Sequence, residues 1–599
     1  MSTLFQNKFT RIIIPLFAIL FFLSCQKDIS NNNGEDTGIF PDFTTKVTAT
    51  VVSGFVTDEN NAAVIGASVN VGGSITSTDD YGFFEVKNAL VVKDAAVVTV
   101  TNPGYFRGIK TFMAENGKSA FFRIKLIPKT NSGNIDAVAG GNVTLGNGMV
   151  IALPANAVVV ASSNVAYTGS VNVAAHWIDP TAADLSQTMP GDLRGVNTDG
   201  YLKTLTTYGM AAVELTSASG ELLQIATNKK ATLTMPVPSA INGTAPSTIP
   251  LWSFDEAKGL WKEEGVATKT GNTYVGEVSH FSFWNCDVPN SYVRFDATVK
   301  DNAGNPIPYA WVKISVVGSP YNSGYGYTDS SGYVSGAVPD NAQLLLEVFT
   351  SYACGTSVYS QNFSTTNVNI SLGVITVTTS LGTATVSGTV TDCTNMPVTN
   401  GYVVMLVNGQ NFRYSLSNTG TYNFTTILCN STASASFIAE DANSLQQSTT
   451  LVQSISAGAN TIPNLQACGV SIQQFITYTI DGGAAISFTW PADSLMHSGN
   501  GGTTSTCYIN GTSMSATPVQ NVSFSFPTVG IAPGGVEILE SFYSSQLGTQ
   551  TTTSGAPVNI TEYGNVGEFI AGNFTATVST PAPIVNYTIV CSFRVRRNF

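Results

Sequence analysis

The chain has 599 residues, in which 26 lysines and arginines stand against 38 aspartates and glutamates, for a net charge of -12 at pH 7. This acidic balance excludes nucleic acid as a partner, because a negative surface repels the phosphate backbone. Charged residues make up only 11% of the chain, and Gly, Thr, Ser, Val and Asn are abundant, which favours strands joined by tight turns. No long stretch shows helical apolar periodicity, so we expect an all-β protein of several domains.

The N-terminal segment has the pattern of an export signal. Lys8 and Arg11 precede an apolar run that ends at Cys25 and is too short to span a bilayer as a permanent helix. A small residue before a cysteine resembles the lipobox of bacterial lipoproteins, although Phe22 stands where Leu is usual. The resemblance implies that residues 1–24 are a lipoprotein signal peptide and that Cys25 carries fatty acyl groups such as palmitate. An ordinary secretory signal and an uncleaved anchor are the alternatives.

Residues 25–47 are predicted to be the lipidated cysteine and a flexible tether, because the run from Ser30 to Asp36 is polar and rich in Asn. Lys27 and Asp28 follow the cysteine directly. A short charged segment there resembles the export signal of Bacteroidota lipoproteins. The resemblance implies a lipid-anchored protein of the outer membrane that faces the cell exterior. The membrane is then a partner through the N-terminal lipid.

Three segments repeat one pattern of alternating strands and two turns, with long insertions between them. The first turn begins at Asp58, Asp301 and Asp392, and a glycine closes the second turn in each copy. The copies resemble the carboxypeptidase regulatory-like domain, which implies seven-stranded sandwiches of the prealbumin or Ig-like type. That domain is the non-catalytic companion of a zinc carboxypeptidase. The predicted boundaries are 48–129, 290–377 and 378–468.

The segment 130–289 is predicted to be a β-rich middle module. Its start, GGNVTLGNGMVIALPANAV, resembles the β-sandwich module shared by netrin receptors and ankyrins. A later stretch, LWSFDEAKGLWKEEGVA, resembles cartilage intermediate layer proteins and related bacterial surface lipoproteins. Trp252 and Phe254 alternate on one predicted strand, and Leu260 and Trp261 begin its partner after a turn.

The tripeptide His280, Phe281 and Ser282 ends this module. In some relatives of the netrin-receptor module an HFS sequence cleaves its own chain. The Ser hydroxyl attacks the preceding carbonyl and His acts as the base. The resemblance implies scission between Phe281 and Ser282. The alternative is a plain strand, in which Phe281 faces one side and His280 and Ser282 face the other.

The second repeat contains a cluster of tyrosines that suits glycan contact, because the apolar faces of sugar rings stack on aromatic rings. Cross-strand pairs beside a hairpin are the alternative. An exposed and coplanar set of rings would favour the glycan hypothesis. The candidate residues are Tyr321, Tyr325, Tyr327 and Tyr333.

The last segment, 469–599, is predicted to be a C-terminal β-domain, which looks like those of other Bacteroidota lipoproteins. Outside Cys25, seven cysteines remain, and an exported protein is free to form disulfides. The candidate pairs are Cys393 with Cys429 and Cys507 with Cys591, because each pair lies within one predicted domain.

No cofactor or metal is expected, because the sequence has no CxxC pair, no HExxH and no EF-hand loop. Calcium held by turn aspartates is an alternative that stays open. We therefore expect a non-enzyme, a membrane-anchored surface lipoprotein that acts as a multi-domain binding or structural protein of the adhesion type. Two further hypotheses are a glycan-binding lipoprotein of a nutrient-uptake system and a self-cleaving surface protein. The identity of a protein or glycan partner does not follow from the sequence.

Overall fold

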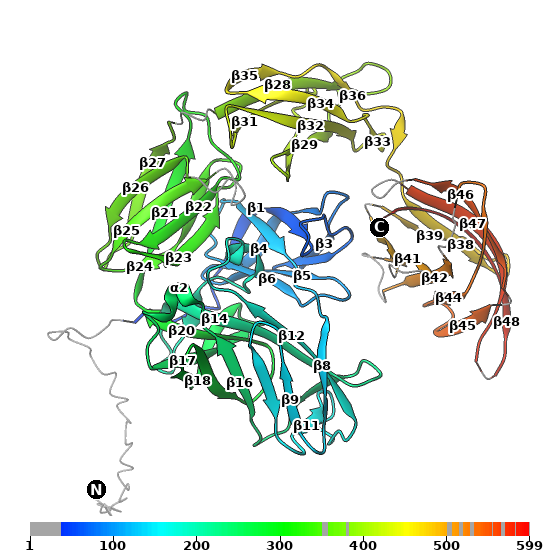
Figure 1. Ribbon diagram of the computed structural model, residues 1–599. Coiled ribbons are helices and arrows are strands. Elements are labelled where there is room, and N and C mark those ends of the chain that lie inside the picture. The colour runs from blue at the N-terminus through cyan, green and yellow to red at the C-terminus, as the bar shows by residue number, and fades with distance from the viewer. Residues whose placement is uncertain are drawn as a thin grey trace, which may run out of the picture. The chain divides into compact units, whose positions relative to one another are not determined.

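The structure is a computed structural model that describes residues 38–349, 357–378, 383–490, 492–499, 506–513, 519–527, 532–553, 555–564, 569–581 and 583–597. The predicted signal peptide, the lipidation site Cys25 and most of the predicted tether lie outside these residues. The described chain is built from strands, with two one-turn helices, α1 (Leu185–Thr188) and α2 (Ser239–Asn242). The all-β prediction is confirmed (Figure 1). Among the described residues, no helix has the length and apolar character needed to cross a membrane.

The first two repeats are seven-stranded sandwiches with the same strand order. In the first, a sheet of order β4-β1-β7 packs on a sheet of order β3-β2-β5-β6. In the second, the orders are β24-β21-β27 and β23-β22-β25-β26. The strands of the first repeat are β1 (Lys46–Thr57), β2 (Ser68–Val71), β3 (Ser74–Ser77), β4 (Phe83–Val92), β5 (Ala96–Thr101), β6 (Gly108–Phe112) and β7 (Ala120–Lys125). Those of the second are β21 (Tyr292–Lys300), β22 (Trp311–Val316), β23 (Ser319–Tyr327), β24 (Tyr333–Pro339), β25 (Gln343–Phe349), β26 (Tyr359–Ser364) and β27 (Ile370–Thr376).

The third repeat follows the same plan with small additions. One sheet has the order β31-β28-β35, with β36 also beside β28, and the other is built on β30-β29-β32, with β34 and β33 beside β32. The strands are β28 (Thr383–Thr391), β29 (Gly401–Val407), β30 (Gln410–Ser415), β31 (Thr421–Ile427), β32 (Thr432–Asp441), β33 (Gln446–Gln447), β34 (Leu451–Ser456), β35 (Gly458–Thr461) and β36 (Leu465–Gln466).

The first turn of each repeat is held by the same local hydrogen bonds. The carboxylate oxygen Oδ1 of Asp301 accepts the N–H groups of Ala303 and Asn305, both at 2.8 Å. Asp58 and Asp392 likewise accept the N–H groups two and four residues further along. These short-range bonds form wherever the turn sequence is present. They explain why the repeat can be recognised from the sequence alone.

The middle module is one large sheet that encloses a hydrophobic core of its own. Its main path runs β11-β15-β14-β20-β17-β18-β19-β16-β10-β9, with β12, β13 and β8 branching from it. The predicted hairpin is confirmed, since Phe254 pairs with Trp261 across β17 and β18. The strands are β8 (Asn131–Asp136), β9 (Gly141–Thr144), β10 (Val150–Leu153), β11 (Val158–Val160), β12 (Ser170–Ile178), β13 (Arg194–Val196), β14 (Leu202–Thr216), β15 (Leu222–Ile225), β16 (Ala231–Pro236), β17 (Thr248–Asp255), β18 (Leu260–Thr270), β19 (Thr273–Val278) and β20 (Phe283–Asn290).

The C-terminal part forms a further β-domain around a core rich in phenylalanine. A short strand, β37 (Val470–Ser471), precedes it and pairs with β33. The remaining strands are β38 (Phe475–Ile480), β39 (Ile486–Thr489), β40 (Ser494–Gly499), β41 (Thr506–Thr512), β42 (Asn521–Pro527), β43 (Val536–Ile538), β44 (Ser541–Ser544), β45 (Thr549–Thr553), β46 (Pro557–Tyr563), β47 (Phe569–Ser579) and β48 (Asn586–Arg596).

The end of the predicted tether is part of the folded chain. The carbonyl oxygen of Ile39 accepts the N–H of Leu202 at 2.7 Å, and the Phe40 ring lies 4.8 Å from the Tyr201 ring. The prediction of a flexible tether up to residue 47 is therefore wrong for residues 39–47, which belong to the folded chain. The reason is that apolar side chains follow the polar run, and one of them, Phe43, packs against a buried cluster that includes Leu202 of the middle module.

The predicted pairing of Cys393 with Cys429 is wrong, because Cys393 is bonded to Cys468. The parallel pairing of Thr391 with Gln466 places the two bonded cysteines side by side, each two residues further on. Cys429 follows the opposite end of the neighbouring strand and is itself in a disulfide. The predicted pairing of Cys507 with Cys591 is also wrong. Both are buried free thiols, on strands β41 and β48, which do not pair with each other.

Candidate functional site

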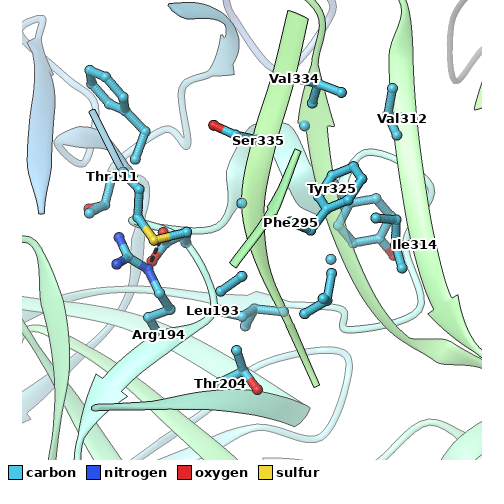
Figure 2. Close-up of a pocket in the computed structure, with 18 of the residues that line it drawn as sticks. Thr111, Leu193, Arg194, Thr204, Phe295, Val312, Ile314, Tyr325, Val334 and Ser335 are labelled. Atoms are coloured by element: carbon cyan, nitrogen blue, oxygen red, sulfur yellow. Dashed lines mark hydrogen bonds and ion pairs between the residues drawn. The ribbon is translucent and has the colours of Figure 1, made fainter. Parts of the chain in front are cut away.

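A cavity of about 180 Å³ reaches into the second repeat between its two sheets. Its apolar wall consists of side chains that belong to the core of that sandwich: Phe295, Val312, Ile314, Val334 and Leu344. Figure 2 shows Phe295, Ile314 and Tyr325 on one side and Thr111, Leu193, Arg194 and Thr204 on the other. The cavity is thus apolar where it enters the second repeat, and the middle module borders it with the charged side chains of Asp192 and Arg194.

Three glycines of the second repeat also line the cavity: Gly324 and Gly326 on β23 and Gly336 on β24. None of them lies in the left-handed region of backbone conformation. A Cβ atom added at Gly336 would meet no atom within 4 Å, and one at Gly324 would meet only the Ala337 carbonyl oxygen at 3.9 Å. A Cβ atom at Gly326 would lie 3.2 Å from Val334 Cγ2, a tight contact. The backbone does not require glycine at these positions, and Gly324 and Gly336 leave open the space that a side chain would fill.

The polar side of the cavity contains an ion pair between the buried Arg194 and the half-buried Asp192. Arg194 is only 2% exposed, and its Nε donates to Asp192 Oδ2 at 2.7 Å, while Nη1 donates to the carbonyl oxygen of Asp94 at 2.6 Å. Burial raises the pKa of Asp192, against the opposing charge of Arg194. The second carboxylate oxygen of Asp192, Oδ1, exposes less than 1 Å² of surface, so a molecule in the cavity does not reach it.

The tyrosine cluster does not form the exposed coplanar set that the glycan hypothesis called for. Tyr321 is 40% exposed, whereas the Tyr325 ring stacks on Trp311 at 5.5 Å. Tyr327 packs edge-on against Phe121 of the first repeat at 5.9 Å. In Tyr333, the hydroxyl donates to Glu115 Oε1 at 2.9 Å. Three of the four tyrosines therefore make packing contacts, and glycan contact stays an untested prediction.

The HFS tripeptide lies in a bend and not in a continuous strand, because β19 ends at Val278 and β20 begins at Phe283. The predicted strand alternation across it is wrong. His280 Nε2 forms a 2.9 Å hydrogen bond with Glu264 Oε2, and Ser282 Oγ donates to the carbonyl oxygen of Phe283 at 3.1 Å. Partial burial raises the pKa of Glu264, but hydrogen bonds, among them one from His280, outweigh it and lower the pKa. The base predicted for self-cleavage therefore pairs with a carboxylate.

The carbonyl oxygen that self-cleavage would attack has a partner of its own. Phe281 O accepts Gln224 Nε2 at 3.1 Å, and Phe281 N–H donates to Gln224 Oε1 at 2.7 Å. The Gln224 amide thus fixes both polar groups of Phe281. Its donor would polarise the carbonyl, as an attack requires, but within the described residues no hydrogen bond joins Ser282 to His280.

The turn aspartates considered for calcium use carboxylate oxygens to bind backbone N–H groups. In the part of the chain that the structure describes, no group of three or more His, Cys, Asp or Glu side chains is placed to hold a metal ion. Calcium binding stays an untested prediction.

A second buried polar cluster joins three domains. Asp79 and Asp80, from the second turn of the first repeat, lie near Arg413 of the third repeat and Arg596 of the last strand. Arg596 Nη2 is 2.6 Å from Asp80 Oδ2, and both side chains are almost fully buried. Burial raises the pKa of Asp80 to about 7, against the charge of Arg596. Glu440, also buried, adds a third carboxylate whose pKa burial raises.

The sequence analysis identified tyrosines that border the cavity but did not predict the cavity. The sequence does contain a sign of it, which becomes visible when the three repeats are aligned on their turn aspartates. The inward positions of the second repeat then contain glycine where the third has aromatic residues.

No family model matches the chain. Human cartilage intermediate layer protein 2 is 32% identical over 110 residues, which cover 18% of this chain and 9% of the human protein. The mouse protein of the same name is 29% identical over 163 residues, covering 26% of this chain and 14% of the mouse protein. The predicted similarity to cartilage intermediate layer proteins is confirmed. The chain nevertheless spans only about a tenth of the length of these curated relatives.

Among solved structures, a shaft pilin, spaA, from Lactobacillus rhamnosus GG has a TM-score of 0.18 and 10% identity, covering 30% of this chain and all of the pilin chain. BcpA, the major pilin subunit of Bacillus cereus, has a TM-score of 0.12 and 8% identity, covering 71% of this chain and all of the pilin chain. Such low TM-scores give these structures no bearing on the function of this chain.

Proposed function

We propose that this protein is a non-catalytic, lipid-anchored protein of the bacterial cell surface, whose tandem β-sandwich domains form an adhesion-type binding or structural scaffold. The observation that carries the proposal is the threefold use of one sandwich topology, in β1–β7, β21–β27 and β28–β36. Repeated small domains extend the protein and provide a large contact surface. Catalysis would require a specific arrangement of side chains, which a sandwich fold alone does not provide.

Buried polar contacts between the domains support a scaffold role. Lys110 of the first repeat is 4% exposed, and its Nζ donates to the carbonyl oxygen of Met189 in the middle module at 2.6 Å. In the other direction, Arg194 of the middle module donates to the Asp94 carbonyl oxygen. Breaking such contacts leaves a buried charge without a partner, which is costly. The domains are therefore suited to hold one another in place.

The lipid anchor is tested by metabolic labelling with a fatty-acid analogue in a Gram-negative host. We expect label on the whole chain and on Ser24→Ala, which keeps a small residue before the cysteine, and no label on Cys25→Ser. Protease added to intact cells should then digest the anchored chain if it faces outward. Label that persists on Cys25→Ser, or a protein recovered wholly from the cytosol, would refute the anchor.

The binding role is tested with the chain from Gln26 onward on arrays of glycans and of extracellular proteins. Saturable binding to a protein supports the scaffold proposal. Binding to glycans alone, lost in Tyr321→Ala, would favour the nutrient-uptake alternative. Turnover of any arrayed substrate would contradict a non-catalytic role.

A further inference from the structure

The cavity of the second repeat occupies a place that aromatic side chains fill in the third. The two repeats align on their first-turn aspartates, Asp301 and Asp392. In each repeat, the valine eleven residues further on faces the core, as Val312 in the second and Val403 in the third. Val312 pairs with Gly326, whereas Val403 pairs with Tyr414.

The facing sheet shows the same replacement. Six residues before the turn aspartate, Phe295 pairs with Gly336 in the second repeat. Val386 holds that position in the third repeat and pairs with Phe424. The rings of Tyr414 and Phe424 stack with their centroids 3.4 Å apart, so they fill the space between the two sheets.

The first repeat has a valine at the position of Gly336. Val86 corresponds to Gly336 and Phe424, since each of the three lies four residues after the glycine of the second turn. Val86 is buried in the core of its sandwich. The second repeat alone has glycine on both sheets, so its interior is open where its two relatives are packed.

The size and lining of the cavity fit one aromatic ring. A cavity of about 150 Å³ with apolar walls is enough to hold benzene in a protein interior, and this one measures about 180 Å³. Apolar side chains such as Phe295 and Ile314 provide the burial that favours an aromatic ring.

We infer that the second repeat binds a small apolar compound with one aromatic ring, in the space that Tyr414 and Phe424 fill in the third repeat. The ring lies against the core side chains of the second repeat. This site is independent of the lipid anchor and of any partner of the scaffold.

The test uses toluene, which is the side chain of Phe as a free molecule. It is titrated into the chain from Gln26 onward and followed by calorimetry. We expect toluene to bind saturably at one site. In the double variant Gly326→Tyr with Gly336→Phe, which copies the third repeat, its affinity should fall about tenfold or more.

Two further variants keep the result interpretable. If the double variant does not fold, Gly336→Val copies the first repeat with a smaller change and should still weaken toluene binding. Gly146→Phe places a ring at a glycine with open space around it in the middle module, and it should leave the affinity unchanged.

Failure of toluene to bind would overturn the inference. So would equal affinity for a folded double variant, because binding would then lie elsewhere.

Discussion

Cys393 and Cys468 are separated by 75 residues in the sequence, yet their Cα atoms are 4.9 Å apart. The bond closes almost the whole third repeat into one loop. A disulfide across a long loop stabilises a domain chiefly by limiting the freedom of its unfolded chain. Buried residues from both sheets of the sandwich, such as Val403 and Phe424, lie between the two cysteines.

We predict that Cys393→Ser lowers the free energy of opening of the third repeat by about 2–4 kcal/mol. Hydrogen exchange of peptides from β28 and β36 in the whole chain measures it. The double variant Cys393→Ser with Cys468→Ser should cost no more than either single variant. Unchanged protection in Cys468→Ser would contradict the pairing.

The contacts of His280 lead to a prediction about chain integrity. Its Nε2 is hydrogen-bonded to Glu264, and Ser282 donates to a backbone oxygen. Since a nucleophilic serine needs a base within hydrogen-bond reach, we expect the purified protein to run as one intact chain under denaturing conditions. Ser282→Ala should migrate identically. Two fragments that become one in this variant would show that the bend rearranges and cleaves.

At the scale of the single element, the second turn of each repeat depends on one glycine. Gly332 has a φ of +78°, and a Cβ atom there would collide with the carbonyl oxygen of Val299. Gly82 and Gly420 are in the same conformation and face the corresponding carbonyl oxygens. An L side chain at this position suffers both backbone strain and a steric clash.

We predict that Gly332→Ala lowers the stability of the second repeat by about 2–4 kcal/mol. Gly304→Ala is the matched control, since it has a similar φ of +84° but open space around it, and it should cost only about 1 kcal/mol. Urea unfolding combined with hydrogen exchange compares the two. Equal costs would mean that the clash with Val299 is relieved by a backbone shift.

The elements also show what can be read from one sequence. Turn positions follow from local bonds, such as Asp301 with Ala303 and Asn305, so they were predictable. The break in the strand at His280 was not, because it depends on Gln224, 57 residues away along the chain, which binds the Phe281 backbone. The glycines of the cavity were visible, but their meaning required the register between β22 and β23.

At the scale of the whole molecule, the buried cluster around Asp80 links the first repeat, the third repeat and the last strand. Three carboxylates, Asp79, Asp80 and Glu440, face two guanidinium groups, Arg413 and Arg596. One acid is therefore in excess, which favours a protonated carboxyl in the cluster. Tyr81 and Tyr402 surround the cluster and stay neutral, because burial raises their pKa values.

We predict that stability falls as pH rises from about 4 to about 7. The pKa of Asp80 is about 7 in the folded chain against a usual 3.8. In this window the folded state holds a proton that the unfolded state has lost, so each pH unit costs up to about 1.4 kcal/mol. Urea unfolding at several pH values measures the slope.

Asp80→Asn mimics the protonated acid and should flatten this slope. Asp199→Asn, the same change at an exposed position, should keep it. Stability that rises with pH in both the native chain and Asp80→Asn would contradict a proton in the cluster.

The sequence by itself determined the all-β class, the three copies of one sandwich and the positions of their turns, because alternation and turn hydrogen bonds act between residues close along the chain. The tertiary structure decided the partner of Cys393, the packing of the tyrosines, the carboxylate that holds His280 and the open interior of the second repeat. Each of these depends on which distant strands become neighbours. Burial of apolar surface selects that arrangement for the domain as a whole, so no local pattern encodes it.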